Sequence, residues 1–226
     1  MFGLRELIGL ILRSEGVRYE IKTVDGASVI ETANVVIRIE HSGRFEAVTG
    51  LGERISGHAL LSADGFVGLR LRDGSLNFDY SHFLPHIEKC STLHGHTATV
   101  SLEVLGRLGT SGYLIDFGEL KRALKSVLNE LDHKLIASVR YVAESADGRV
   151  TLRFVGKGGE YELTLPADRV VLLEGESTAE NISMHIAKRV AELLGVAPLL
   201  VRVEMSEGMG KSAVSEVLVS GRTSGP

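Results

Sequence analysis

Residues 82–96 carry the clearest chemical signal in the chain. His94 and His96 are separated by one residue, so in an extended strand both imidazoles point to the same face. His82 lies in an upstream segment whose apolar residues favour a strand, and it can supply a third ring nitrogen. Three protein ligands leave one coordination position vacant, which is typical of a catalytic rather than a structural zinc. The sequence therefore predicts a zinc site formed by these three histidines.

Three further residues near this site could move protons. Cys90, the only cysteine of the chain, lies between His82 and His94. A free cysteine is often a small buried hydrophobe, but a thiol beside three histidines is also a candidate general base. Asp132 and His133 end a stretch with helical periodicity, where a histidine interacts well with the helix dipole. The same pair suits acid–base chemistry, because an aspartate can fix the tautomer of a histidine.

Together these residues resemble the 6-pyruvoyl-tetrahydropterin synthase and 6-carboxy-tetrahydropterin synthase family. The likeness rests on the aromatic-x-x-x-His segment Phe78 to His82, the run Cys90 to His96, and Leu131-Asp132-His133. It extends from about Leu76 to the C-terminus and does not cover residues 1–70. The resemblance implies that the cysteine removes a proton from the substrate side chain next to a zinc ion. It also implies that the aspartate and histidine complete a proton relay, often assembled across a subunit interface.

Recognition of a pterin ring requires a carboxylate that accepts hydrogen bonds from the 2-amino group and a ring N–H. In the family this glutamate ends a Val-x-Val-x-Glu strand, and here Met205 occupies the expected place. Glu207 shares a strand face with Met205, whereas Glu204 faces the other way unless a bulge intervenes, so we favour Glu207. Thr178 and Glu180 belong to a Thr-x-Glu-Asn unit that resembles the family. Both are substrate-binding candidates, although Glu180 equally suits helix capping.

The resemblance also implies the reaction. Members of the family act on 7,8-dihydroneopterin triphosphate. One branch yields 6-pyruvoyl-tetrahydropterin, and another yields 6-carboxy-tetrahydropterin with acetaldehyde, in the route to deazaguanine nucleosides. The short spacer between Cys90 and His94 resembles the second branch. We therefore expect a zinc-dependent lyase that makes 6-carboxy-5,6,7,8-tetrahydropterin. The alternatives are a pyruvoyl synthase, retro-aldol cleavage of dihydroneopterin, and a non-catalytic zinc-binding scaffold.

Composition places limits on the partners. The chain has 226 residues, 44% of them hydrophobic and 24% charged, as in ordinary globular proteins. Its net charge of -4 gives no reason to expect nucleic acid as a partner. No apolar run is long enough to cross a bilayer, and a single cysteine fits a reducing cytosol. We expect a cytoplasmic protein with a small-molecule substrate and no membrane partner.

Hydrophobic periodicity from residue 71 to the C-terminus predicts the order β-β-α-α-β-β. Apolar stripes predict one helix from Glu119 to Leu131, and a second that starts with a capping box at Ser177. This order is that of the tunnelling fold which the resemblance implies: an α+β fold with two helices on one face of a four-stranded antiparallel sheet. The resemblance further implies a homo-oligomer, a hexamer built as a dimer of trimers.

Two segments fall outside this order. Residues 1–70 read as a β-rich extension of unknown role, with a short helix near Leu4 to Ile11 and a turn at Asp25-Gly26. Residues 137–176 read as an insertion that contains a hairpin around Gly156 to Gly159. We expect this insertion to be an elaboration of the surface.

Overall fold

The computed structural model describes residues 18–40, 44–49, 54–58, 66–108, 111–195, 198–208 and 210–219. Contacts divide the chain into two compact units. The first consists of residues up to Gly68 together with Leu105–Leu114, and the second contains the remainder. The helix predicted near the N-terminus lies outside the described residues. Within the described residues, no helix combines the length and apolarity that a membrane span requires.

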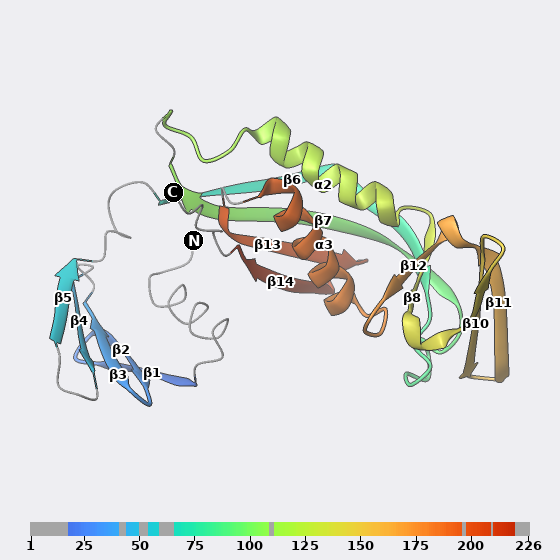
Figure 1. Ribbon diagram of the computed structural model, residues 1–226, viewed down its shortest axis with the longest axis horizontal. Coiled ribbons are helices and arrows are strands. Elements are labelled where there is room, and N and C mark those ends of the chain that lie inside the picture. Colours follow the sequence, from blue (N-terminus) through green and yellow to red (C-terminus); the bar gives the residue numbers. More distant parts are fainter. Residues whose placement is uncertain are drawn as a thin grey trace. The chain divides into compact units, whose positions relative to one another are not determined.

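The first unit contains an antiparallel sheet whose strands follow one another in chain order (Figure 1). The strands are β1 (Tyr19–Val24), β2 (Ala27–Thr32), β3 (Val35–Ile39), β4 (Arg44–Thr49) and β5 (Arg54–His58). Asp25 and Gly26 form the predicted turn, and both have positive φ angles, 50° and 76°. This conformation suits the two-residue turn of a hairpin. Ala27, Val29 and Ile30 of β2 are buried.

The second unit is built on a six-stranded sheet with the order β12-β8-β6-β7-β13-β14. The strands are β6 (Phe66–His82), β7 (His94–Arg107), β8 (Lys134–Ser138), β12 (Val170–Leu173), β13 (Pro198–Glu207) and β14 (Ser212–Leu218). The predicted four-stranded antiparallel sheet is therefore too small. The short strand β8 pairs in parallel with the end of β6, and β12 pairs in parallel with β8. β12 lies within the predicted insertion, residues 137–176, and β8 begins just before it.

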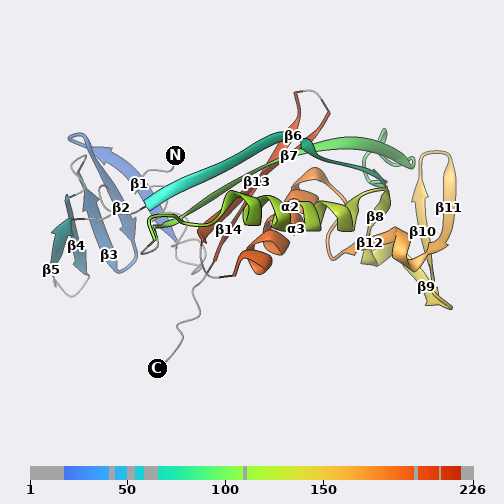
Figure 2. The ribbon, with the colours of Figure 1, turned by 90° about the horizontal axis from the view of Figure 1, so that it is seen from above.

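Two helices, α2 (Phe117–Leu131) and α3 (Ala179–Leu194), cover one face of this sheet (Figure 2). The buried stripe of α2 is the predicted one: Leu120, Leu124, Val127, Leu128 and Leu131. On α3, Leu193 belongs to the apolar residues at helical spacing, but it is 48% exposed, and the smaller Ala187 and Ala191 are buried. The residue that caps α3 is Thr178 rather than Ser177, so the predicted capping box does not form; three residues after Thr178 stands Asn181, whose side chain donates to Glu176 O. Ser177 is fully buried and makes other hydrogen bonds.

The two faces of the sheet differ in chemistry. We call the side packed against α2 and α3 the helix face and the other side the polar face. On β7, the even-numbered residues from Ala98 to Val104 are buried on the helix face, while Thr97, Thr99, Ser101 and Glu103 lie on the polar face. The alternation along β6 changes phase between Arg72 and Leu76, where the Ser75 N–H donates to Asp73 Oδ1 at 2.9 Å.

Within residues 137–176, β9 (Val142–Ala146), β10 (Arg149–Gly156) and β11 (Gly159–Pro166) form a second, three-stranded sheet. β10 and β11 make a hairpin that turns between Gly156 and Gly159, the position that the sequence indicated. Short 3-10 turns at Val139–Tyr141 and Ala167–Arg169 flank the sheet. Its apolar residues Val150, Leu152 and Phe154, all on β10, form one buried cluster with Phe83, Leu135 and Ala137 of the main sheet and its connections.

Candidate metal centre

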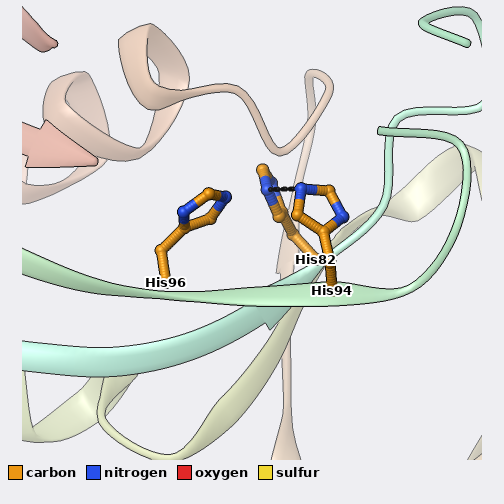
Figure 3. Close-up of side chains that lie close together, drawn as sticks. All are labelled: His82, His94 and His96. Atoms are coloured by element: carbon orange, nitrogen blue, oxygen red, sulfur yellow. Dashed lines mark hydrogen bonds between the residues drawn. The ribbon is translucent and has the colours of Figure 1, made fainter. Parts of the chain in front are cut away.

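Three imidazole rings converge at the end of β6 and the start of β7 (Figure 3). His82 comes from β6, and His94 and His96 come from β7. One ring nitrogen of each histidine lies within 4.8 Å of the other two. The distance between His82 Nε2 and His94 Nε2 is 3.0 Å, and both ring centroids lie 5.1 Å from that of His96. The structure thus brings together the three histidines that the sequence singled out.

Backbone carbonyl groups determine which nitrogen of two rings faces the centre. His82 Nδ1 lies 2.6 Å from Ser177 O, and His94 Nδ1 lies 2.8 Å from Thr92 O. A carbonyl oxygen only accepts hydrogen bonds, so each Nδ1 carries the proton and each Nε2 presents a lone pair. Burial lowers the pKa of His82, in opposition to its bond with Ser177, and this keeps the ring in the neutral form that binds metals.

This donor set fits a divalent cation such as zinc. Two Nε2 lone pairs that face each other at 3.0 Å repel unless a proton or a cation lies between them. In a tetrahedral zinc site with Zn–N of about 2.0–2.1 Å, neighbouring nitrogens lie about 3.3 Å apart. In a histidine that binds a metal, the other ring nitrogen usually donates a hydrogen bond to a carbonyl or carboxylate oxygen, as the Nδ1 groups of His82 and His94 do here. The three histidines could therefore hold a metal ion with one position left for substrate or water.

Gly95 explains why a glycine separates the two histidines of β7. A β-carbon at this position would lie 2.8 Å from the backbone oxygen of Tyr80 on β6. Real β-carbons do not approach a carbonyl oxygen this closely, so any other residue would push the two strands apart. The missing side chain lets β6 and β7 approach each other where His82 must meet the rings of β7.

Tyr80 connects the metal centre to a carboxylate. Its ring lies 5.2 Å from that of His82 and 5.7 Å from that of His96, measured between centroids. Its hydroxyl donates a short hydrogen bond to Glu207 Oε1 at the end of β13. Burial and the adjacent Glu207 carboxylate raise the pKa of Tyr80 far above its ordinary value, so the hydroxyl keeps its proton. The sequence analysis missed Tyr80, although its spacing of two residues from His82 places both on one strand face.

The other pterin-binding candidates occupy different places. Glu204 lies on the polar face, where its carboxylate pairs with Arg72 at 3.3 Å. Thr178 caps α3, and its hydroxyl accepts a hydrogen bond from the Asn181 N–H at 3.4 Å. Glu180 is exposed in the first turn of α3. Of the four candidates, Glu207 is the one that the structure connects to the histidine cluster through a hydrogen-bonded side chain.

Cys90 is half-buried in the connection between β6 and β7. Its backbone oxygen accepts a hydrogen bond from the Leu84 N–H at 2.6 Å, which closes this connection into a compact loop. Cys90 is not among the side chains whose ligand atoms converge with those of the histidines.

Asp132 and His133 form a second polar cluster together with Asp79, a residue that the sequence analysis missed. His133 Nδ1 lies 2.9 Å from Asp132 Oδ2, and the positive φ of His133, 56°, allows these adjacent side chains to meet. Asp132 Oδ1 accepts from the Asp79 N–H at 2.9 Å, and this bond is the main reason that the pKa of Asp132 is lowered. The Asp79 carboxylate accepts from Thr97 on the polar face. Within one chain, Asp132 and His133 therefore do not join the histidine cluster, which lies on the helix face.

Comparisons with known proteins agree with this geometry. The family model described as 6-pyruvoyl tetrahydropterin synthase matches residues 74–216, which include every residue of both clusters. The chain belongs to this family. A Pyrococcus horikoshii protein assigned as a 6-carboxy-5,6,7,8-tetrahydropterin synthase is 37% identical over 121 residues, 52% of this chain and 71% of the relative. The resemblance inferred from the sequence is thereby confirmed.

Two further similar proteins, one known from its structure and one from its sequence, show how far the chemistry of the relatives extends. The solved structure of Plasmodium falciparum 6-pyruvoyl tetrahydropterin synthase covers 69% of this chain and 100% of its own, with a TM-score of 0.59 and 25% identity. A dihydroneopterin monophosphate aldolase of Pyrococcus furiosus is 40% identical over 58 residues, 26% of this chain and 49% of the relative. Pterin chemistry is therefore common to these relatives, while their named reactions differ.

Proposed function

We propose that the protein is a zinc-dependent lyase that converts 7,8-dihydroneopterin triphosphate to 6-carboxy-5,6,7,8-tetrahydropterin. The observation that carries the proposal is the convergence of three imidazoles beside a tyrosine–glutamate pair. Metal ligands and a carboxylate anchor are the two features that a pterin with a hydroxylated side chain needs. The short spacer between Cys90 and His94 and the assigned activity of the Pyrococcus horikoshii relative favour the carboxy branch.

Glu207 takes the role of the pterin anchor in this proposal. Its carboxylate can accept two hydrogen bonds, from the 2-amino group and from a ring N–H of the pterin. Tyr80 already donates to Oε1 of this carboxylate and so restricts its orientation. A fixed carboxylate places the pterin ring at one distance from the histidines, and the side chain of the substrate then points to the metal centre.

The histidines hold the metal, and the other polar residues move protons. Zinc bound there would supply a Lewis acid that acidifies a side-chain hydroxyl of the substrate and polarises the adjacent carbonyl. Cys90 accepts the proton removed from the substrate side chain. His133, oriented by Asp132 through Nδ1, keeps Nε2 free to give or take a proton at the neighbouring carbon or oxygen.

The proposed reaction needs more than one copy of the chain. Asp132 and His133 lie toward the polar face, whereas the histidine cluster and Glu207 belong to the helix face. We therefore assign the relay beside each metal centre to Asp132 and His133 of another subunit. A hexamer built as a dimer of trimers is the assembly that the family resemblance implies.

Identification of the product tests this proposal. The purified, zinc-loaded protein is incubated with 7,8-dihydroneopterin triphosphate, and the products are identified by mass. Acetaldehyde, inorganic triphosphate and 6-carboxy-tetrahydropterin are the expected products, with one water consumed per substrate. A pterin that retains its three-carbon side chain would identify a pyruvoyl synthase instead. Unchanged substrate would favour a zinc-binding scaffold without catalysis.

The aldolase of Pyrococcus furiosus favours one second candidate. Retro-aldol cleavage of dihydroneopterin or its monophosphate would release a two-carbon aldehyde and leave a hydroxymethyl group on the pterin. The identity of 40% covers only 58 residues. It therefore supports a similar site in the two proteins more strongly than it supports the same reaction. The same mass analysis with dihydroneopterin monophosphate as substrate separates this activity from the carboxy synthase.

A further inference from the structure

The connection between β6 and β7, residues 83–93, carries Cys90 and touches the sheet of the insertion at both ends. We propose that the insertion, residues 137–176, is a brace that fixes this connection and thereby positions Cys90 beside the metal centre. The proposal deepens the proposed function and rests on it for the role of Cys90. The packing on which it depends involves Phe83, Ser91 and Glu176.

The first contact of the brace is an aromatic stack at Phe83, the residue that follows His82. The rings of Phe83 and Phe154 are stacked, with centroids 3.7 Å apart and planes inclined by 7°. Tyr161 extends the stack on the other side of Phe154, with centroids 4.8 Å apart. Phe83 and Phe154 are 1% and 5% exposed, so this contact is part of a packed core. The insertion therefore fixes the start of the connection.

The second contact fixes Ser91, the residue that follows Cys90. The backbone N–H of Lys157 donates to Ser91 Oγ at 2.9 Å, and Ser91 Oγ donates to Glu88 O, also at 2.9 Å. Ser91 is 2% exposed, and loss of its hydroxyl would leave the Lys157 N–H and the Glu88 carbonyl without this partner. The turn of the hairpin and the turn that carries Cys90 are thus joined through one buried hydroxyl.

Gly156 shows how close this second contact is. A β-carbon added there would lie 2.4 Å from Ser91 O and 3.1 Å from the ring of Tyr161. The first of these atoms belongs to the backbone and cannot turn aside, so a side chain at residue 156 would displace the Cys90 turn. The outer ion pair of Lys157 with Glu88, 3.0 Å long, is exposed and contributes little.

The third contact lies inside the insertion and fixes its last residue, Glu176, beside the segment that orients His82. Tyr141 Oη and Arg140 Nη1 donate to Glu176 Oε1, at 2.8 and 3.0 Å. Glu176 precedes Ser177, whose carbonyl oxygen accepts the Nδ1 proton of His82. Each contact of the insertion thus falls one residue away from a group of the site: His82, Cys90 or Ser177. This placement goes beyond the surface elaboration that the sequence suggested.

Substitutions at the second contact test the brace, and the reactivity of the Cys90 thiol reports their effect. Because Cys90 is the only cysteine, its alkylation by iodoacetamide can be timed in the full-length, zinc-loaded protein. In Gly156→Ala and Ser91→Ala we expect the half-buried thiol to react roughly threefold or more faster, because the turn opens more often. We also expect kcat to fall about tenfold with KM nearly unchanged, since the anchor and the metal ligands are not touched.

The matched control is Val155→Ala, which removes a side chain that is 66% exposed on the same strand. It should leave alkylation, kcat and zinc affinity at wild-type values. If Gly156→Ala does not fold, Ser91→Ala decides. Folded variants with wild-type alkylation and wild-type kcat would overturn the brace, and so would a loss of zinc that accompanies faster alkylation. Faster alkylation with unchanged kcat would keep the brace and remove Cys90 from the proposed reaction.

Discussion

The helix face and the polar face of the six-stranded sheet are built from the same strands and differ in what surrounds them. On the helix face, the histidines and Tyr80 continue a row of buried apolar residues, and their rings pack against one another. On the polar face, charged side chains form ion pairs between strands: Arg70 of β6 with Glu103 of the neighbouring β7 at 3.1 Å, and Arg72 of β6 with Glu204 of β13, across β7, at 3.3 Å. A strand alternates its side chains, so one strand can serve both faces.

The difference explains where a metal centre can form. Ligands must be held in one geometry, and packed neighbours restrict rotamers more effectively than exposed ion pairs do. The polar face contains a depression of about 350 Å³ that is lined by Arg70, Arg72, Arg202, Glu103 and Glu204 among others, and its charges of opposite sign are paired. We therefore expect the metal ligands and the packed core of the helix face to be the most sensitive to substitution.

Removal of a metal ligand should have the largest effect. His94→Ala leaves two imidazoles, so we expect zinc to be lost and turnover to fall by about a thousandfold or more, which corresponds to several kcal/mol of transition-state stabilisation. Metal content by mass spectrometry and product formation measure the two effects. His86→Ala is the control, because that ring is exposed on the connection between β6 and β7. Zinc retained at wild-type affinity in His94→Ala would contradict the site.

Substitutions of two neighbouring residues of β7 compare how much each face contributes to the free energy of unfolding. Leu102 is fully buried on the helix face, and Leu102→Ala should lower the free energy of unfolding by about 2–5 kcal/mol. Ser101 lies on the polar face, and Ser101→Ala should change it by less than about 0.5 kcal/mol. Urea denaturation followed by circular dichroism measures both. Equal losses would show that the polar face is also covered by tightly packed protein.

The relay on the polar face should affect catalysis without affecting the metal. Asp132→Asn keeps the shape of the side chain but weakens its hold on the His133 imidazole, so we expect kcat to fall about a hundredfold. Zinc content should stay at the wild-type level, because Asp132 is not part of the histidine cluster. Steady-state kinetics with parallel metal analysis test this. A wild-type kcat would exclude the pair from the reaction.

The smallest expected difference is in KM for the substrate, between substitutions of two glutamates of β13. Glu207→Gln removes the negative charge that Tyr80 fixes beside the histidines, and we expect KM for the pterin substrate to rise about tenfold. Glu204→Gln acts on the polar face and should change KM by less than about twofold. A larger rise in KM for Glu204→Gln than for Glu207→Gln would reverse the assignment of the anchor.

Local signals in the sequence predict the elements that carry the site. The stripe of α2, the hairpin of β10 and β11 and the spacing of His94 and His96 all depend on residues close together in the chain. The size of the main sheet was not predicted, because β8 and β12 are short strands that pair in parallel with distant partners. A pairing of that kind leaves no periodic signal in the strand itself.

The partners that orient the site residues were largely invisible for the same reason. Ser177 is far from His82 in the chain, and it acts through its carbonyl oxygen, which every residue possesses. Asp79 acts on Asp132 mainly through its N–H, which is equally independent of residue type. Only Tyr80 carried a usable signal, through its side chain and its spacing from His82.

The absent side chain of Gly95 links the two halves of the proposed site. Its backbone faces the Tyr80 carbonyl, and the Tyr80 hydroxyl holds Glu207. A methyl group at residue 95 would contact neither metal nor pterin, yet it would widen the gap between β6 and β7 and shift both groups together. The distance between the histidine cluster and Glu207 is therefore set by how near two backbones can come.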